Sequence, residues 1–162
     1  MLKEITHFPG KTLIGLRSDT SLSNYAAPKL WPQFMPRRKE IPNLVSEDNF
    51  SVQLYNGIYS FKSFTPFIEF EYWAAVEVSD VDHIPAGMEV LEIPEGLYAI
   101  FIHKGPVTEF VQTLRFIHEQ WLPTSGFEID HRPHFEVLGK KYLGTQHPDS
   151  EEEVWVPIRA IS

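Results

Sequence analysis

The sequence has no cysteine among its 162 residues. This absence excludes a disulfide framework, a thiolate metal site and a cysteine nucleophile. No apolar run approaches the roughly 20 residues that cross a bilayer as a helix, and the N-terminal segment lacks the apolar core of a signal peptide. We therefore expect a cytoplasmic protein that does not span a membrane.

Positive charge is also scarce. The chain has 14 lysines and arginines against 22 acidic residues, a formal net charge of -8. Its one basic cluster, at 37–39, is followed directly by Glu40. Such a chain repels phosphate backbones, so nucleic acid is not an expected partner. The acidic balance gives only slight weight to a cationic ligand, because negative charge commonly serves solubility alone.

The arrangements that usually mark metal and triad chemistry are missing. Seven histidines are present, but His103 and His118 are too far apart in sequence, and His131 and His134 lack an assured third ligand. The chain shows no nucleophile elbow around a serine. We expect neither a metal nor another cofactor, and no catalytic triad.

Aromatic residues and prolines, by contrast, are frequent. Aromatics make up 14% of the chain and there are 13 prolines. This composition predicts a rigid, aromatic-lined fold with many turns. The length suits one domain over 1–162, built as one unit or as two similar halves packed together.

The first part of the chain predicts a strand at 11–17, a helix over about 26–40, and strands at 50–55 and 67–78. Three prolines, Pro28, Pro32 and Pro36, interrupt the regularity of the helix. A turn-prone segment around Asn56 and Gly57 joins the two later strands.

From residue 84 the same order of elements recurs. Strands are predicted at 88–93 and 97–103, joined by a hairpin turn at 94–96, and a helix follows over about 106–122. Two acidic strand segments, 133–138 and 153–158, complete the chain. The order predicts an α+β fold of two pseudo-symmetric β-α-β-β halves, about 1–83 and 84–162, whose antiparallel sheets form a central ligand cleft. No residue-level repeat accompanies this order of elements.

Each acidic strand carries a glutamate within an otherwise apolar segment, Glu136 in the first and Glu153 in the second. Period-two alternation places Glu153 and Trp155 on one face of the second strand and Val154 and Val156 on the other. Burying a carboxylate is costly unless it is paired. We therefore expect Glu153 and Trp155 to point into a cavity while the valines pack under a helix. A solvated face of an edge strand is the alternative.

Four segments, in order, resemble the GyrI-like small-molecule-binding domain: residues 98–106, 121–127, 132–136 and 152–158. This domain is also the effector-binding domain of AraC-type and MerR-type multidrug-responsive regulators. Residues 30–35 and 70–78 resemble its stand-alone branch. The resemblance implies two pseudo-symmetric halves around a cleft, in which aromatic walls surround a buried glutamate and bind amphipathic, often cationic aromatic compounds. The length leaves no room for a helix-turn-helix, so direct transcription control is not expected.

The resemblance carries over to individual residues. Glu136 and Glu153 match the acidic positions of the family and Trp155 matches an aromatic position. Leu138 stands where many relatives have a tyrosine, which removes one hydroxyl from the expected polar contacts.

Three further aromatic residues are candidate walls of the cleft. Either face of the strand at 67–78 could line it, and we favour Trp73 over Tyr72. Tyr55 and Phe101 are candidates for which core packing is an equal alternative.

Two carboxylates in one cleft could serve either of two functions. They could neutralise a cationic ligand, with cation–π contacts from the tryptophans, as in drug or effector sensing or sequestration. Alternatively, one acid with a raised pKa beside a general base could activate water. Some stand-alone members that resemble this chain hydrolyse strained, electrophilic cyclopropane compounds. We favour binding, since nothing beyond the acids supplies a nucleophile or an oxyanion hole. A purely structural role is a third possibility.

Overall fold

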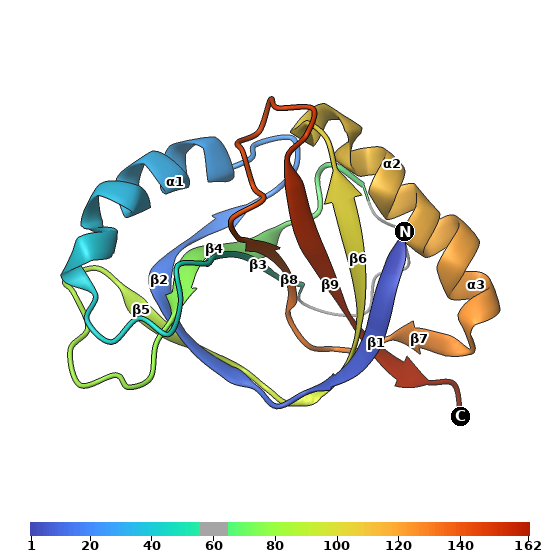
Figure 1. The fold of residues 1–162 in the computed structure, drawn as a ribbon, viewed down its shortest axis with the longest axis horizontal. Helices are drawn as coiled ribbons and strands as arrows, with labels where there is room; N and C mark the ends of the chain where they lie inside the picture. Colours follow the sequence, from blue (N-terminus) through green and yellow to red (C-terminus); the bar gives the residue numbers. More distant parts are fainter. Residues whose placement is uncertain (56–64) are drawn as a thin grey trace.

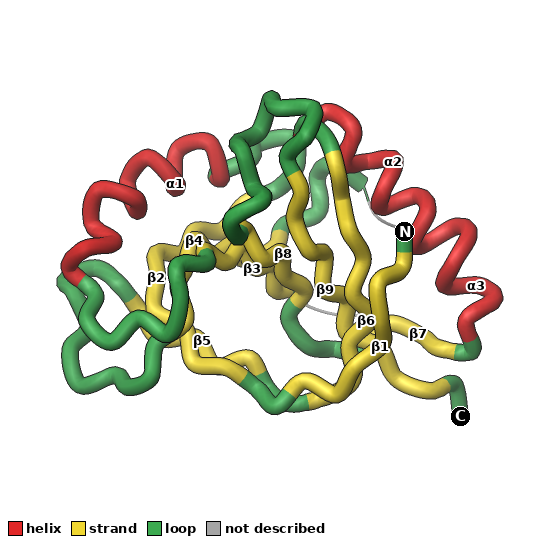
Figure 2. Tube along the Cα trace, viewed as in Figure 1, coloured by secondary structure: helices red, strands yellow, loops and turns green. Residues whose placement is uncertain are grey.

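A computed structural model describes residues 1–55 and 65–162, and these form one curved sheet with two helical segments packed on it (Figures 1 and 2). The turn predicted at Asn56 and Gly57 lies outside the described residues. No helix in the described ranges is long and apolar enough to cross a membrane.

The sheet has nine antiparallel strands in the order β1-β6-β9-β8-β3-β4-β2-β5, with β7 paired to β9 at one side. Their bounds are β1 Leu2–Phe8, β2 Lys11–Thr20, β3 Asn49–Leu54, β4 Phe70–Glu77, β5 Glu89–Ile93, β6 Gly96–Lys104, β7 Phe127–Ile129, β8 His134–Leu138 and β9 Glu151–Ala160. All seven predicted strands are present, whereas β1 and β7 were not predicted.

The strand order has the symmetry that the α+β prediction implies. Strands β8, β9, β6 and β1 run outward from the centre on one side, and β3, β4, β2 and β5 run outward on the other. The two sides join where β3 pairs with β8, with Ser51 opposite Glu136. The fold class is therefore confirmed, and the predicted sheets of the two halves are one continuous sheet.

The predicted hairpin at 94–96 is wrong. Strands β5 and β6 do not pair with each other, because β5 pairs with β2 and β6 pairs with β1. The pairs Phe8–Gly96 and Lys11–Ile93 lie on either side of the connection. Residues 94–95 therefore lie opposite residues 9–10, and the paired segments on either side form one long two-stranded ribbon. Proline and glycine mark an interruption of pairing, but they do not determine whether the chain folds back.

Both predicted helices form. The first consists of α1 Ala27–Phe34 and a 3-10 segment, η1 Met35–Glu40. The second begins with the 3-10 turn η3 Val107–Glu109 and continues through α2 Phe110–Arg115, a π-helical segment η4 Phe116–Trp121, and α3 Leu122–Ser125. Gly126 ends it with φ 82°, a left-handed conformation that glycine adopts without strain.

Rows of residues across the paired strands define the two faces of the sheet. On one face, which we call the helix face, the row is Leu16, Ala74, Ser51, Glu136, Val154 and Phe101. On the opposite face, the neighbouring row is Arg17, Trp73, Val52, Phe135, Trp155 and Ile100. A side chain's face thus follows from its register.

Both helical segments pack on the helix face, on either side of its centre (Figure 1). Leu30 and Phe34 of α1 pack with Tyr72 of β4, while Ile117 of η4 packs with Val154 of β9. The opposite face encloses an aromatic cluster that includes Phe8, Phe50, Trp73, Tyr98 and Phe135. The centre of the helix face, at β3 and β8, therefore lies between the two helical segments.

Candidate functional site

A cavity of about 340 Å³ opens on the helix face, within the range of roughly 300 to 1,000 Å³ found for small-molecule pockets. One wall is the helical segment 107–118, and the floor comes from β8, β9 and the end of β3. The lining residues are Leu22, Tyr25, Gln53, Tyr55, Phe70, Val107, Phe110, Val111, Leu114, His118, Ile129, Asp130, His131, Arg132, His134, Glu136, Val154, Trp155 and Val156.

Glu136 is the acidic group on the floor of this cavity. It lies on β8 and is half-buried. Gln53 Nε2 donates to Glu136 Oε1 at 3.1 Å, and Ser51 Oγ donates to the same oxygen at 3.4 Å. None of the ion pairs formed by the described residues involves Glu136. Glu136 is therefore hydrogen-bonded but has no cationic partner among the described residues.

A chain of hydrogen bonds connects Glu136 to α1. Trp31 Nε1 donates to the hydroxyl of Tyr72 at 2.8 Å, and that hydroxyl is 2.6 Å from Ser51 Oγ. Because Ser51 uses its proton to donate to Glu136, Tyr72 must donate to Ser51. Each hydroxyl in the chain therefore directs its proton toward the carboxylate, an arrangement that stabilises its charged form.

The electrostatic surroundings nevertheless favour the neutral acid. Burial, together with the nearby charge of Glu152, raises the pKa of Glu136 to about 8, and the hydrogen bonds from Gln53 and Ser51 only partly oppose this. Burial also raises the pKa of Glu152 to about 7. Glu152 lies on the same face of β9 as Val154, two positions away. The two acids are thus neighbours whose charges disfavour each other.

Imidazole groups also line the cavity. Burial lowers the pKa of His118, on η4, to about 4. Burial, with smaller effects from His118 and Arg132, lowers the pKa of His134 to about 3. Both rings are therefore neutral at physiological pH, when each can donate one hydrogen bond and accept another.

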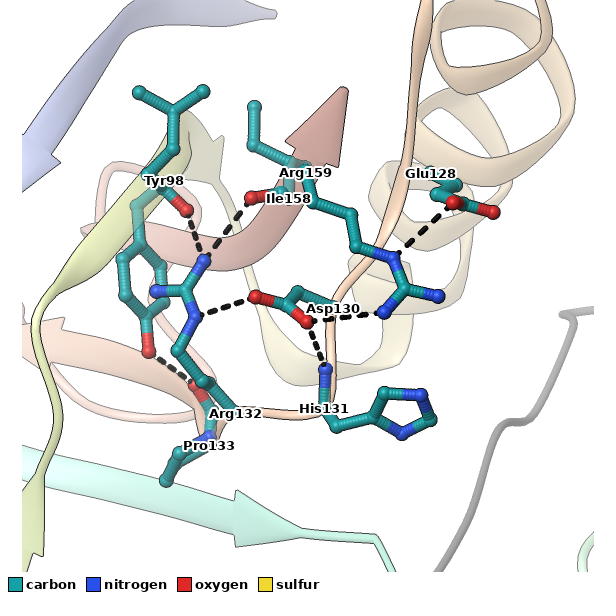
Figure 3. Close-up of polar contacts among 9 residues, drawn as sticks. Tyr98, Glu128, Asp130, His131, Arg132, Pro133, Ile158 and Arg159 are labelled. Atoms are coloured by element: carbon teal, nitrogen blue, oxygen red, sulfur yellow. Dashed lines mark hydrogen bonds and ion pairs between the residues drawn. The ribbon is translucent and has the colours of Figure 1, made fainter. Parts of the chain in front are cut away.

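Arg132 fixes the loop between β7 and β8 that borders the cavity (Figure 3). Its Nε donates to Asp130 Oδ2 at 2.8 Å, and its Nη2 donates to the carbonyl oxygens of Leu97 and Ile158 at 2.6 and 3.0 Å. The guanidinium lies 4.7 Å from the ring centroid of Tyr98. These contacts tie the loop to β6 and β9, while the buried Nη1 of Arg132 has no hydrogen-bond partner among the described residues.

The same loop explains two local details. A Cβ added to Gly96 would lie 2.4 Å from the Arg132 guanidinium, so this position needs glycine. Burial opposes the ionisation of Asp130, but hydrogen bonds from Arg132 and from the backbone of His131 outweigh it and lower the Asp130 pKa. The ring of His131 points away from Arg132 (Figure 3). The loop thus carries its own compensated charges.

Three of the six predicted site residues line the cavity: Glu136, Tyr55 and Trp155. Tyr55 packs against His134 with ring centroids 5.1 Å apart and planes at 89°. Burial and the charge of Glu136 raise the pKa of the Tyr55 hydroxyl.

Glu153 is not in the cavity, which corrects the expectation. It lies on the opposite face of the sheet, where it pairs with Lys3 and accepts a hydrogen bond from Trp155 Nε1 at 3.1 Å. The alternation along β9 was predicted correctly, and Val154 and Val156 do pack under the helical segment with Ile117. The error was to assign the cavity to the face of β9 that carries Glu153 and Trp155. The cavity lies on the face that carries Val154, and the acidic residue on that face is Glu152.

The remaining predicted aromatics pack in the interior. Trp155 borders the cavity, but its indole stacks on Phe135 on the opposite face, with centroids 5.2 Å apart. Trp73, also on that face, is buried and donates to Glu71 Oε1 at 2.7 Å. Phe101 is buried beneath the helical segment against Trp121. These placements show core packing.

Sequence reasoning missed the polar floor of the site. Ser51 and Gln53 alternate with Phe50 and Val52 on β3, a polar face within an apolar strand that could have been recognised. His134 lies within the strand predicted at 133–138 and begins β8, but it was considered only as a metal ligand. Among the described residues, no group of three or more histidine or acidic side chains is arranged to hold a metal.

Comparison with known proteins agrees with this geometry. A family profile described as "GyrI-like small molecule binding domain" matches residues 3–159. A curated relative, the transcriptional regulator BrlR of Pseudomonas aeruginosa, is 27% identical over 161 residues. The match covers 98% of this chain and 56% of BrlR, so the chain spans about half the length of that relative.

Solved structures share the fold at low identity. The EcmrR C-terminal domain has a TM-score of 0.71 at 18% identity, with 99% of each chain covered. SAV2435 bound to tetraphenylphosphonium has a TM-score of 0.68 at 15% identity, covering 96% of this chain and 93% of that one. A hydrolase encoded by lin2189 of Listeria innocua has a TM-score of 0.58 at 14% identity, covering 96% and 91%.

Proposed function

The chain belongs to the family of GyrI-like small-molecule-binding domains, and we propose that its cavity binds amphipathic organic cations with an aromatic or otherwise apolar body. Binding of this kind would serve to sense or to sequester such compounds. The proposal assigns the cation to Glu136 and the apolar body to the aromatic and aliphatic walls.

One observation carries the proposal: Glu136 lies on the floor of a largely apolar cavity without a cationic partner among the described residues. A buried carboxylate is costly when no opposite charge accompanies it. A ligand cation about 4 Å away would gain roughly 4 kcal/mol of Coulomb energy at an intermediate dielectric. The site thus gains most from a ligand that brings the missing charge.

Two of the similar proteins support this proposal, although what is known of them concerns those proteins and not this chain. SAV2435, which shares the fold, was solved with a lipophilic aromatic cation, tetraphenylphosphonium. BrlR is a transcriptional regulator of which this chain matches about half. A role in sensing therefore has a precedent in a relative, and a role in sequestration is open to the same cavity.

Titration calorimetry with tetraphenylphosphonium tests the proposal. We expect Glu136→Gln to weaken this cation at least tenfold at pH 8.5, about 1.4 kcal/mol, and to weaken neutral triphenylphosphine oxide less than threefold. Glu153→Gln is the matched control, because it makes the same change on the opposite face. An equal loss for both ligands, or an equal loss in both variants, would contradict the role of Glu136.

A second candidate function rests on the position of Glu136 and Glu152, which are neighbours on the helix face of β8 and β9. Burial raises the pKa of both acids and their charges disfavour each other, so one acid can hold a proton while the other is ionised. The ionised carboxylate could take a proton from a water molecule while the oxygen of that water attacks an electrophilic carbon. The protonated carboxyl group could then protonate the carbon or heteroatom that is released. A protein with this fold is named a hydrolase.

This alternative has its own test. Strained, electrophilic cyclopropane compounds would be incubated with the protein and hydrolysis followed by mass spectrometry. Turnover that is lost in both Glu136→Gln and Glu152→Gln would establish it, with Glu153→Gln again as the control. Binding without any hydrolysed product would leave the binding function alone.

A further inference from the structure

We propose that His134 is a second polar anchor of the cavity, which selects cations that carry a hydrogen-bonding heteroatom on their aromatic body. This inference rests on the proposed function, because it concerns the same ligand and the same cavity. It adds a ligand class: cations with a hydroxyl, amine or carbonyl group are preferred over cations that present hydrocarbon alone.

The position of His134 carries the first step. It lies on β8 two residues before Glu136, so both side chains are on the helix face and both line the cavity. Two residues of a strand advance about 6.6 Å. That distance is comparable to the length of a substituted aromatic ring, so one ligand could reach Glu136 with its cation and His134 with a polar substituent.

The second step is the hydrogen-bonding state of the ring. Neither nitrogen of His134 has a hydrogen-bond partner among the described residues, and the residue is partly buried in the lining of the cavity. The contact that holds the ring is the perpendicular packing of Tyr55, at 5.1 Å and 89°. The ring is therefore oriented by packing, and its donor and acceptor are left for water or a ligand.

The third step is charge. Because burial keeps the pKa of His134 low, near 3, the ring stays neutral and does not repel a bound cation. A neutral imidazole offers one N–H and one lone pair, so it can serve a hydroxyl, an amine or a carbonyl. Arg132 is unsuited to this role because its positive charge repels a cationic ligand. Its Nε and Nη2 are bonded to Asp130 and to backbone carbonyls, and its Nη1 is buried without a hydrogen-bond partner among the described residues.

Three other polar residues of the cavity are less suited. Gln53 already donates to Glu136 and Ser51. Asp130 is engaged by Arg132. His131 is exposed, so water competes with any ligand group there. His134 thus combines a fixed orientation with unused hydrogen-bonding capacity.

The test compares tetraphenylphosphonium with its (4-hydroxyphenyl)triphenylphosphonium analogue by calorimetry at pH 7.5. The pair differs by one hydroxyl at one ring. We expect the wild type to bind the hydroxylated cation three- to tenfold more tightly, the gain of about one net hydrogen bond. His134→Phe should abolish that preference while binding tetraphenylphosphonium within threefold of the wild type.

Two further variants keep the test decisive if His134→Phe folds poorly. His134→Gln, whose amide supplies a donor and an acceptor, should retain part of the preference. His83→Phe, the matched control at an exposed histidine outside the cavity, should retain all of it. In addition, the ¹⁵N shifts of the His134 ring should move with the hydroxylated cation and not with tetraphenylphosphonium.

The outcomes separate the two proposals. If the wild type binds neither cation, the proposed function fails. If it binds both cations equally, or if His134→Phe keeps the preference for the hydroxyl, the binding function stands and the role of His134 is overturned.

Discussion

Two glutamates on neighbouring strands show how differently the two faces of this sheet treat a carboxylate. Glu153 on β9 faces the aromatic side, where Lys3 neutralises it and Trp155 donates a hydrogen bond to it. Glu136 on β8 faces the helix side, where it receives hydrogen bonds from Ser51 and Gln53 but has no cationic partner in the part of the chain that the structure describes. An acid beside an indole looked like the better binding site, yet it is the compensated one.

The difference teaches that a partly buried charge indicates function when the protein leaves it uncompensated. The surroundings of the acids differ in the same sense. On the opposite face, the rings of Phe8, Tyr98 and Phe135 fill the space around Trp155. On the helix face, a cavity of about 340 Å³ is left next to Glu136. One face is filled by packed side chains, and the other contains the cavity to which we assign the ligand.

The largest expected effect tests that division through stability. Phe135 is fully buried and stacks on Trp155, so Phe135→Ala should cost about 3 to 5 kcal/mol of unfolding free energy in urea titrations. Phe135→Leu, which leaves a smaller void, should cost clearly less. A loss below about 1 kcal/mol for the alanine variant would show that the aromatic face is not the main support of the fold.

The next effect concerns pH. The pKa of Glu136 is raised to about 8 in the folded protein, so the folded state holds a proton that the unfolded chain releases near its ordinary value. Stability should therefore fall as the pH rises from about 5 to 9. Glu136→Gln should remove part of this fall, on the order of 1 to 3 kcal/mol. Urea titrations across this range measure the difference from wild type, and a constant difference would contradict it.

Much of the fold could be predicted from the sequence, because periodicity reports local structure. The apolar spacing over 106–122 predicted the helical segment that forms one wall of the cavity, although the π-helical turns of η4 leave no such signature. Strand pairing was harder. The proline and glycine at 94–96 read as a hairpin, but the partners of β5 and β6 are β2 and β1. Pairing depends on long-range contacts that local composition does not encode.

The site could be predicted only in part, for a similar reason. Alternation divides β9 into two faces, but it does not say which face borders a cavity. Glu136 was found as a glutamate within an apolar strand and by its match to an acidic position of the family, whereas Glu152 was overlooked beside Glu153. The hydrogen-bond chain through Tyr72 and Ser51 joins residues from distant segments. Such a chain becomes visible only once the register of β3, β4 and β8 is known.

A smaller effect is expected from the hydrogen bonds that connect Tyr72 and Ser51 to Glu136. Tyr72→Phe removes the hydroxyl that accepts from Trp31 and donates to Ser51, and it should cost about 1 kcal/mol of stability. With less support for its charged form, Glu136 should bind tetraphenylphosphonium three- to tenfold more weakly at pH 7, as measured by calorimetry.

Tyr98→Phe is the matched control for this hydroxyl. The Tyr98 hydroxyl is equally buried but donates to the carbonyl of Pro133, at 2.7 Å. Its loss should cost similar stability with little change in affinity for the cation. If both variants weaken binding to the same degree, the effect of Tyr72 is a general loss of rigidity, and the hydrogen-bond chain has no special role.

The smallest expected effect lies at the acid that the sequence favoured. The Lys3 and Glu153 side chains are 45% and 28% exposed, so water screens their ion pair and it should contribute about 0 to 1 kcal/mol. Lys3→Ala and Glu153→Gln should each lower stability within that range in urea titrations and leave the affinity for tetraphenylphosphonium within twofold. Lys3→Ala is the more stringent variant, because it leaves Glu153 ionised without its cation. If removing this lysine raised cation affinity several-fold, Glu153 would be a second, masked acidic site, and the division between a structural face and a binding face would not hold.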